Sequence, residues 1–321
     1  MRFLLVKTSS LGDVVHNLPV VSDLCRVFPG AQIDWCVEEA FAEIPRLHPG
    51  VGEVIPVAIR RWRKTLGERR IWQEIGEFRQ HLRERAYDAI LDTQGLVKSA
   101  LIAWQARGEK FGYAGEVARE PFAARFYDRK FVIPPNAHAV VRNRWLAAAA
   151  FDYPVDLPLD YGIATPDVEM PWLGERPHAV LLTATSRDEK LWDEARWIAV
   201  AQSIENRGLS PVFPAGSPVE RERAERLAAA VPGALAAPPL GLRALACLLG
   251  RARLAIGVDT GLAHLATALG VPTVAIYVAT DPALTGVYGP GFARNLGTRG
   301  QPPSAEQVLA AVEQGLRPWH A

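Results

Sequence analysis

The stretch MRFLLVKTSSLGDVV at residues 1–15 predicts how the first half of the chain folds. Residues 3–6 form a short apolar run, which is typical of a strand buried on both faces of a sheet. A loop of small residues follows, and Asp13 opens a helical pattern that we expect to reach Phe28, where Pro29-Gly30 ends it. The apolar run is too short for a signal peptide or a membrane span.

The same alternation of strand and helix continues along the chain. Further strands are predicted at 33–37, 54–57 and 89–92, with helical stretches between them. Five prolines then interrupt the pattern between residues 152 and 177, as in a linker. Beyond it we expect strands at 178–183, 211–213, 254–258 and 273–278, and helices at 194–206, 218–230, from 260 onward and at 304–316.

Strand–helix alternation of this kind predicts an α/β chain with two doubly wound parallel sheets. We place the first domain at residues 1–160 and the second at 161–321, with the last helix, 304–317, able to pack back on the first domain. Open parallel sheets bind ligands at the carboxyl ends of their strands, so loops of both domains should line a central cleft. The formal net charge of +1 argues against a nucleic-acid partner.

The loop from Lys7 to Asp13 lies at such a strand end. It matches neither the dinucleotide-binding glycine motif nor the P-loop, so NAD and Walker-type ATP sites are unsupported. Asp13 can be a helix cap, or a general base that takes a proton from an acceptor hydroxyl. The position alone does not separate the two interpretations.

Four cations flank one tryptophan in the segment IRRWRK at residues 59–64. They are Arg60, Arg61, Arg63 and Lys64, and Lys98 and Arg119 can extend the same surface. Such a run is often only a solvated face. In a chain of near-neutral charge it also fits an acceptor with carboxylates or phosphates.

Two segments of the second half suit a diphosphate. After the strand at 178–183, Thr185 and Ser186 offer hydroxyl donors and Lys190 a positive charge, although a charged helical turn explains them equally well. In VDTGLAH, residues 258–264, the N–H groups of Thr260, Gly261 and Leu262 can hold a phosphate at a helix start. We expect Asp259 to cap that helix, and His264 to be either structural or a ligand contact.

Glu220 begins another helix, where it can bind ribose hydroxyls or complement the helix dipole. No Asp-x-Asp motif and no His/Cys cluster of metal-ligand spacing occurs in the sequence, so we expect no metal. The three cysteines are scattered, which favours reduced thiols in a cytoplasmic protein.

Together the strings VKTSSLGDVVH (6–16), IRRWRK (59–64), DTQGLVKS (92–99), AREP (118–121) and VDTGLAH (258–264) resemble the lipopolysaccharide heptosyltransferase I family, within glycosyltransferase family 9. The resemblance implies a GT-B fold of two Rossmann-like domains. It also implies an inverting, metal-independent transfer of heptose from ADP-heptose to the 5-hydroxyl of the first Kdo of Kdo2-lipid A. Apart from the resemblance, we expect a monomer without cofactor, associated with the cytoplasmic face of the inner membrane.

On this resemblance Asp13 is the general base, and Lys190 stabilises the charge on the departing ADP. The donor residues would be Thr185, Ser186, Glu220, Asp259, Thr260, Gly261, Leu262 and His264. The acceptor residues would be Ser10, Gly12, Arg60, Arg61, Arg63, Lys64, Gln94, Lys98 and Arg119. The sequence departs from the family pattern at Val278-Ala279 and Ala215, both in the donor half.

Three alternatives remain open. The chain can be a heptosyltransferase that acts on an already heptosylated core, although we would expect such an enzyme to lack the cationic run at residues 60–64. It can be a nucleotide-sugar epimerase, which would need no acceptor. From a different class, it can be an idle sugar-nucleotide-binding protein, which would bind ADP without turnover.

Overall fold

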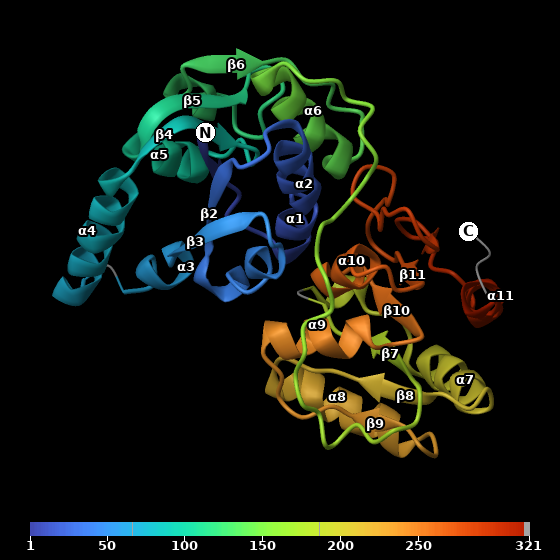
Figure 1. Cartoon of the computed structure of the whole chain (residues 1–321). Helices are drawn as coiled ribbons and strands as arrows, with labels where there is room; N and C mark the ends of the chain where they lie inside the picture. The colour runs from blue at the N-terminus through green and yellow to red at the C-terminus, as the bar shows by residue number, and fades with distance from the viewer. Residues whose placement is uncertain (66, 186, 318–321) are drawn as a thin grey trace. The chain divides into compact units, whose positions relative to one another are not determined.

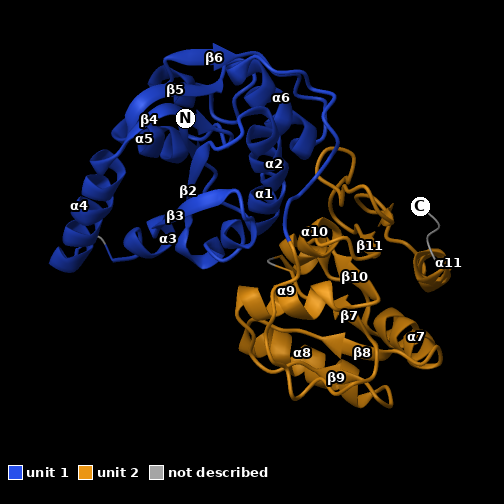
Figure 2. Cartoon of the chain, in the orientation of Figure 1, with its two compact units in different colours: residues 1–163 blue, residues 164–321 orange. Residues whose placement is uncertain are grey.

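The computed structural model describes residues 1–65, 67–185 and 187–317. The chain divides into two compact units, residues 1–163 and 164–321 (Figure 2). The predicted boundary after residue 160 lies close to this division.

Unit 1 is built on a sheet of six parallel strands. These are β1 (Arg2–Val6), β2 (Gln32–Glu38), β3 (Val51–Val57), β4 (Ala86–Asp92), β5 (Arg107–Tyr113) and β6 (Arg129–Phe131). Their order is β3-β2-β1-β4-β5-β6 (Figure 1). All the strands predicted in this half are confirmed, and each begins one to three residues earlier than expected.

Helices cover both faces of this sheet. They are α1 (Leu11–Val15), α2 (Leu18–Val27), α3 (Ile59–Trp62), α4 (Arg69–Glu84), α5 (Val97–Gln105) and α6 (Ala139–Phe151), with short 3-10 helices η1 (Glu39–Phe41), η2 (Pro45–Leu47) and η3 (Pro121–Phe126). The prediction of one helix from Asp13 to Phe28 is wrong. Asn17 is the N-cap residue of a second helix there, without a side-chain cap hydrogen bond, and Pro19 occupies the first turn of that helix. Proline lacks an N–H and clashes with a preceding helical turn, so it favours a helix start over a helix interior.

Alternate side chains of β1 build two cores. Leu4 and Val6 pack in one buried cluster with Leu82 of α4 and Ile102 of α5. Phe3 points to the other face, where its ring lies 4.9 Å from that of Phe151 in α6. Because successive strand residues face opposite sides, one apolar strand can hold both helical layers.

Unit 2 repeats this topology. Its strands are β7 (His178–Leu182), β8 (Ser210–Phe213), β9 (Leu235–Ala236), β10 (Leu254–Val258), β11 (Thr273–Ile276) and β12 (Ala293–Leu296). Its helices are η4 (Asp188–Lys190), α7 (Glu194–Glu205), α8 (Pro218–Ala229), α9 (Leu242–Gly250), α10 (Gly261–Ala268) and α11 (Ala305–Leu316). The order β9-β8-β7-β10-β11-β12 matches that of the first sheet strand for strand. Two doubly wound parallel sheets are therefore confirmed.

The last helix belongs to unit 2. Val308 and Val312 of α11 are buried in the core of this unit together with Trp197 of α7. The apolar face of this helix is therefore covered within its own unit, and its packing on the first domain stays a prediction. No helix in the described part of the chain is long and apolar enough to cross a membrane.

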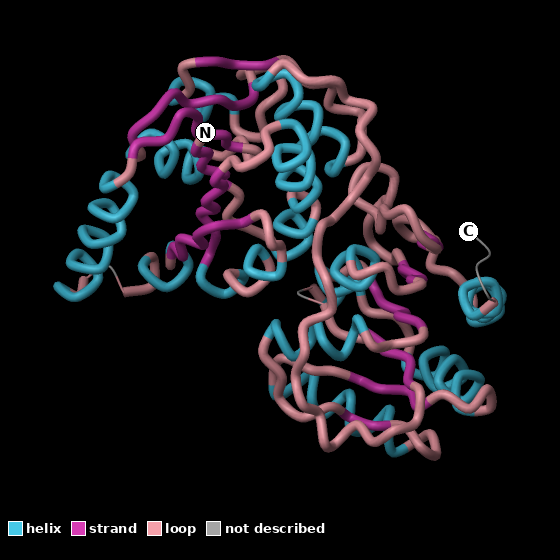
Figure 3. The backbone as a smooth tube through the Cα atoms, viewed as in Figure 1, coloured by secondary structure: helices cyan, strands magenta, loops and turns pink. Residues whose placement is uncertain are grey.

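The proline-rich segment between α6 and β7 contains neither helix nor strand, as predicted (Figure 3). It is held against unit 1 near its middle. Gly162 has a φ of +65°, and a Cβ at this position would lie 2.1 Å from His48 Nε2. Only glycine fits there, because both the backbone conformation and the close approach exclude a side chain.

Candidate functional site

Each sheet changes its winding direction beside its first strand, between β1 and β4 in unit 1 and between β7 and β10 in unit 2. Ligands of doubly wound sheets bind at such switch points, at the carboxyl ends of the strands. Most of the predicted site residues lie in the loops that leave these four strands.

Gln94 joins the two sides of the switch point in unit 1. Its Oε1 accepts hydrogen bonds from the Thr8 N–H at 2.7 Å and the Ser9 N–H at 3.2 Å, and its Nε2 donates to the Ser9 carbonyl. The side chain is buried, and its bonds position the loop after β1. Gly95 has a φ of +67°, which turns the chain from β4 towards α5.

Asp13 lies in the first turn of α1. Its Oδ2 accepts from the Ser10 N–H at 2.8 Å and from the Ser10 Oγ at 3.1 Å, which forms a reciprocal cap of the helix. Neither of these bonds uses Oδ1, and the residue is partly exposed. The cap thus fixes the orientation of a carboxylate that can still accept a proton, so the two interpretations of Asp13 are compatible.

A cationic group forms around Lys98, whose Nζ donates to the Ser9 Oγ at 2.8 Å. Burial lowers the pKa of Lys98. Four charged groups also shift this pKa and therefore lie nearby: Glu38, Arg60, Arg119 and Asp13. The structure thus brings Arg60, Lys98 and Arg119 together with Asp13 from loops that are far apart in the sequence.

The other cations of the run differ in their surroundings. Arg61 pairs with Glu39 at 3.1 Å and with Glu74 at 2.7 Å, so its guanidinium is engaged within the surface. Arg63 and Lys64 are exposed. The Arg60 guanidinium lies 5.0 Å from the centre of the Phe41 ring.

Sequence reasoning missed two buried charged residues at this switch point. Lys7 donates from Nζ to the Thr93 carbonyl at 2.8 Å. The pKa of Lys7 is lowered, because burial lowers it by more than the negative charge of Asp13 raises it. Glu38 is 1% exposed, and its Oε1 accepts the Arg60 N–H at 2.9 Å. Its Oε2 has no partner among the described residues. A charged residue directly after a predicted strand was the available signal for both, although β2 in the structure includes Glu38.

Asp259 is the centre of the corresponding site in unit 2. Its Oδ2 accepts from Lys190 Nζ at 2.6 Å and from the Thr280 Oγ1 at 2.7 Å, and its carbonyl accepts from the Thr185 Oγ1 at 3.2 Å. Burial by itself raises the pKa of Asp259, but the hydrogen bonds from Lys190 and Thr280 outweigh it, so the pKa is lowered. Thr280 was missed, although it follows the Val278-Ala279 departure.

The prediction that Asp259 caps α10 is wrong. Thr260, not Asp259, is the N-cap residue, and it forms no side-chain cap hydrogen bond. The Asp259 carboxylate binds Lys190 and Thr280 instead. A carboxylate that is largely shielded from solvent is stabilised more by a cation and a hydroxyl donor than by a single backbone N–H. Gly261 and Leu262 begin the helix, and His264 is buried one turn further along.

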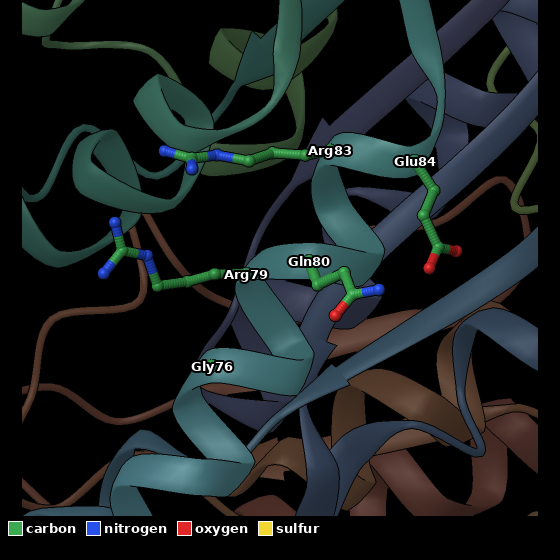
Figure 4. Close-up of a pocket in the computed structure, with 5 residues that line it drawn as sticks. All are labelled: Gly76, Arg79, Gln80, Arg83 and Glu84. Carbon is green, nitrogen blue, oxygen red and sulfur yellow. The ribbon is translucent and has the colours of Figure 1, made fainter.

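Glu220 forms a reciprocal cap at the start of α8. Its Oε2 accepts from the Gly216 N–H at 2.7 Å and the Ser217 N–H at 3.0 Å, so its role in the structure is that of a capping residue. Ser186 lies outside the described residues. A shallow hollow of about 460 Å³ runs along α4 and is lined by Gly76, Arg79, Gln80, Arg83 and Glu84 (Figure 4). None of the predicted site residues lines it.

Comparison with known proteins identifies the family. The model of glycosyltransferase family 9 (heptosyltransferase) matches residues 75–310. The chain belongs to glycosyltransferase family 9. It is therefore an enzyme that transfers a glycosyl group, and the resemblance inferred from its motifs is confirmed.

Members of family 9 resemble this chain over most of its length. Lipopolysaccharide heptosyltransferase 1 of Pseudomonas aeruginosa is 47% identical over 291 residues, which cover 90% of this chain and 82% of the relative. The structure of E. coli heptosyltransferase WaaC with ADP superposes with a TM-score of 0.90 at 40% identity and covers 98% of this chain and 100% of that chain. The same enzyme with ADP-2-deoxy-2-fluoro heptose gives a TM-score of 0.88 at 40% identity and covers 98% of this chain and 99% of that one. By contrast, lipopolysaccharide heptosyltransferase 2 of Salmonella typhimurium is 25% identical over 310 residues, covering 89% of this chain and 85% of that protein.

Proposed function

We propose that this glycosyltransferase moves L-glycero-D-manno-heptose from ADP-heptose to the 5-hydroxyl of the first Kdo of Kdo2-lipid A, in lipopolysaccharide core synthesis. The observation that carries the proposal is the loop at the first switch point, where Ser9 accepts from Lys98 and the adjacent Ser10 donates to the Asp13 carboxylate. The charges of Arg60 and Arg119 also act on Lys98 there. A base beside cations suits a hydroxyl acceptor that itself carries carboxylates and phosphates. The likeness to heptosyltransferase 1 over heptosyltransferase 2 supports this acceptor.

In the proposed reaction Asp13 removes the proton of the acceptor hydroxyl while the oxygen attacks the anomeric carbon of heptose. The bond from that carbon to the diphosphate breaks, and ADP leaves from the opposite face, so the configuration inverts. One carboxylate is sufficient for this single displacement. The Ser10 hydrogen bonds to Oδ2 keep the carboxylate oriented for the transfer.

The departing ADP gains negative charge, which the chain can neutralise with its own groups. Lys190 has three donors, so it can keep its bond to Asp259 and still meet a phosphate oxygen. The N–H groups at the start of α10 and the hydroxyls of Thr185 and Thr260 can supply further donors. We propose metal independence on the strength of these fixed donors. ADP-heptose as donor follows the ligands of the E. coli relative.

We further propose that the enzyme is a monomer at the cytoplasmic face of the inner membrane, where a lipid-anchored acceptor would be found. The first experiment measures ADP release from ADP-heptose, with and without deacylated Kdo2-lipid A, in the presence of EDTA. We expect release that depends on the acceptor and survives EDTA. Release only with a heptosylated acceptor would move the assignment to the later heptosyltransferase step, and ADP binding without release would support the idle binder.

A further inference from the structure

An aromatic patch is exposed on unit 1 beside the acceptor group. Its exposed side chains are Leu101 and Trp104 of α5, 39% and 56% exposed, and Phe122 of η3, 52% exposed. The Phe126 ring links them, since its centre lies 6.4 Å from the Trp104 ring and 5.9 Å from the Phe122 ring. Buried Ala100, Ala123 and Ala124 join α5 to η3 beneath these rings. We call Leu101, Trp104, Phe122 and Phe126 the α5 patch.

The α5 patch continues directly from the acceptor group. Lys98, Leu101 and Trp104 follow one another at intervals of three residues on α5, so each lies next to the one before it on the helix surface. Trp104 lies about 9 Å along the helix axis from Lys98 at the usual rise per residue. An amphiphilic molecule held at Lys98 by its charged head would therefore have apolar surface next to it.

Cations border the α5 patch. The Arg125 guanidinium lies 5.1 Å from the centre of the Phe122 ring. On the neighbouring α4, Arg83 Nε donates to the Gln105 carbonyl at the end of α5. Figure 4 shows Arg79 and Arg83 extending to the same side of α4, while Gln80 and Glu84 extend to the other. Exposed aromatic rings bordered by arginines are the composition that lies at a membrane interface with anionic headgroups.

We propose that the α5 patch docks the enzyme on an anionic phospholipid bilayer, with its rings at the level of the headgroups and Arg79, Arg83 and Arg125 on lipid phosphates. The inference rests on the proposed function, because a lipid-anchored acceptor is what the docked enzyme would meet. A second copy of this chain is the main competing occupant. The arginines argue against it, since two copies would bring like charges together at the edge of the patch.

The test is flotation of the whole protein with vesicles of phosphatidylethanolamine and phosphatidylglycerol, compared with vesicles of phosphatidylcholine alone. Trp104→Ser combined with Phe122→Ser should weaken binding to the anionic vesicles at least about tenfold, since two rings lose their burial. Arg79→Gln combined with Arg125→Gln should remove the preference for anionic vesicles. Val219→Ser, at an apolar residue of α8 that is 76% exposed, is the matched control and should bind like the wild type.

All variants should transfer heptose to the deacylated acceptor at the wild-type rate. Equal vesicle binding by the wild type and the ring variant would overturn the inference. So would a wild-type dimer that the ring variant converts to a monomer while vesicle binding stays unchanged. If the wild type binds vesicles through the patch but transfers nothing to any acceptor, the proposed function fails and the docking surface stands.

Discussion

Lys190 Nζ lies 2.6 Å from Asp259 Oδ2, across the switch point of the second sheet. Both side chains are largely shielded from solvent, so neither charge could remain there without the other or a ligand. The lysine that should neutralise a diphosphate is thus already held by a carboxylate that would repel one. In the proposed reaction, donor binding would therefore compete with, or share, this ion pair.

Replacing Lys190 should weaken ADP binding, whereas replacing Asp259 should leave it unchanged or strengthen it. Lys190→Ala removes the cation and leaves Asp259 to repel the diphosphate, so ADP should bind at least about tenfold more weakly. Asp259→Asn keeps an oxygen for Lys190 and Thr280 but removes the repulsion, so ADP should bind as tightly as to the wild type or tighter. Calorimetric titration of ADP measures both. A strong loss of affinity in Asp259→Asn would mean that the carboxylate itself contacts the donor.

Asp13→Asn should lower turnover strongly while ADP binding persists. The amide oxygen can still accept the Ser10 hydrogen bonds, so the cap of α1 is retained, but the amide cannot take a proton. We expect kcat to fall by about 10²–10⁴-fold. Steady-state kinetics with saturating donor and acceptor, beside an ADP titration, separate the two effects. Near-normal turnover would remove Asp13 as the base.

Arg60 and Arg61 should behave differently despite being neighbours. Arg60→Ala removes a cation next to Lys98, so the apparent KM for the acceptor should rise several-fold while that for ADP-heptose stays constant. Arg61→Ala breaks the pairs to Glu39 and Glu74 and should chiefly lower the thermal midpoint. Kinetics and thermal melts of the two variants, side by side, check this. Equal KM effects would mean that Arg61 leaves its carboxylates to bind the acceptor.

Glu38 should act as a positioning residue for the segment that contains Arg60. In Glu38→Ala the Arg60 N–H loses its acceptor, which should raise the KM for the acceptor and lower the free energy of unfolding by about 1–3 kcal/mol. In Glu38→Gln the amide oxygen restores the bond, so the KM should return towards that of the wild type. If both variants show the same KM, the negative charge matters and the bond to Arg60 does not.

Acid should weaken unit 1 through His48. Burial lowers the pKa of His48 to about 4 from an ordinary 6.5. Its Nδ1 accepts the Gly50 N–H at 3.0 Å, so the proton of the neutral ring is on Nε2, next to the Ser22 Oγ. Between pH 4 and 6.5 the unfolded chain binds a proton that the folded chain does not, so stability falls as the pH falls.

The loss from this group should total about 2–3 kcal/mol between those pH values. Denaturant unfolding at a series of pH values measures it. The variant His48→Gln should flatten the curve in this range, even if its stability at neutral pH is lower. An unchanged slope would show that other groups cause the acid sensitivity.

The two sheets and most of their strands could be predicted because apolar runs and turn residues are local signals. The order of the strands in a sheet has no local signal in the sequence, and this order determines which loops lie next to one another. Gln94 illustrates this, since its motif was recognised but its hydrogen bonds to Thr8 and Ser9 depend on β1 and β4 being neighbours. The Asp259–Lys190 pair joins residues 69 positions apart, so no spacing rule could reveal it. The break at Asn17 was readable from Pro19, whose preference for a first turn was overlooked.

The two sheets agree in strand order, and each takes all of its strands from one unit. Each sheet and its own core lie wholly on one side of the division between residues 163 and 164. A gene cut in the irregular segment before β7 would therefore yield two fragments, each with a complete set of hydrogen-bonded strands. The two units could then be crystallised or screened against inhibitors as separate proteins.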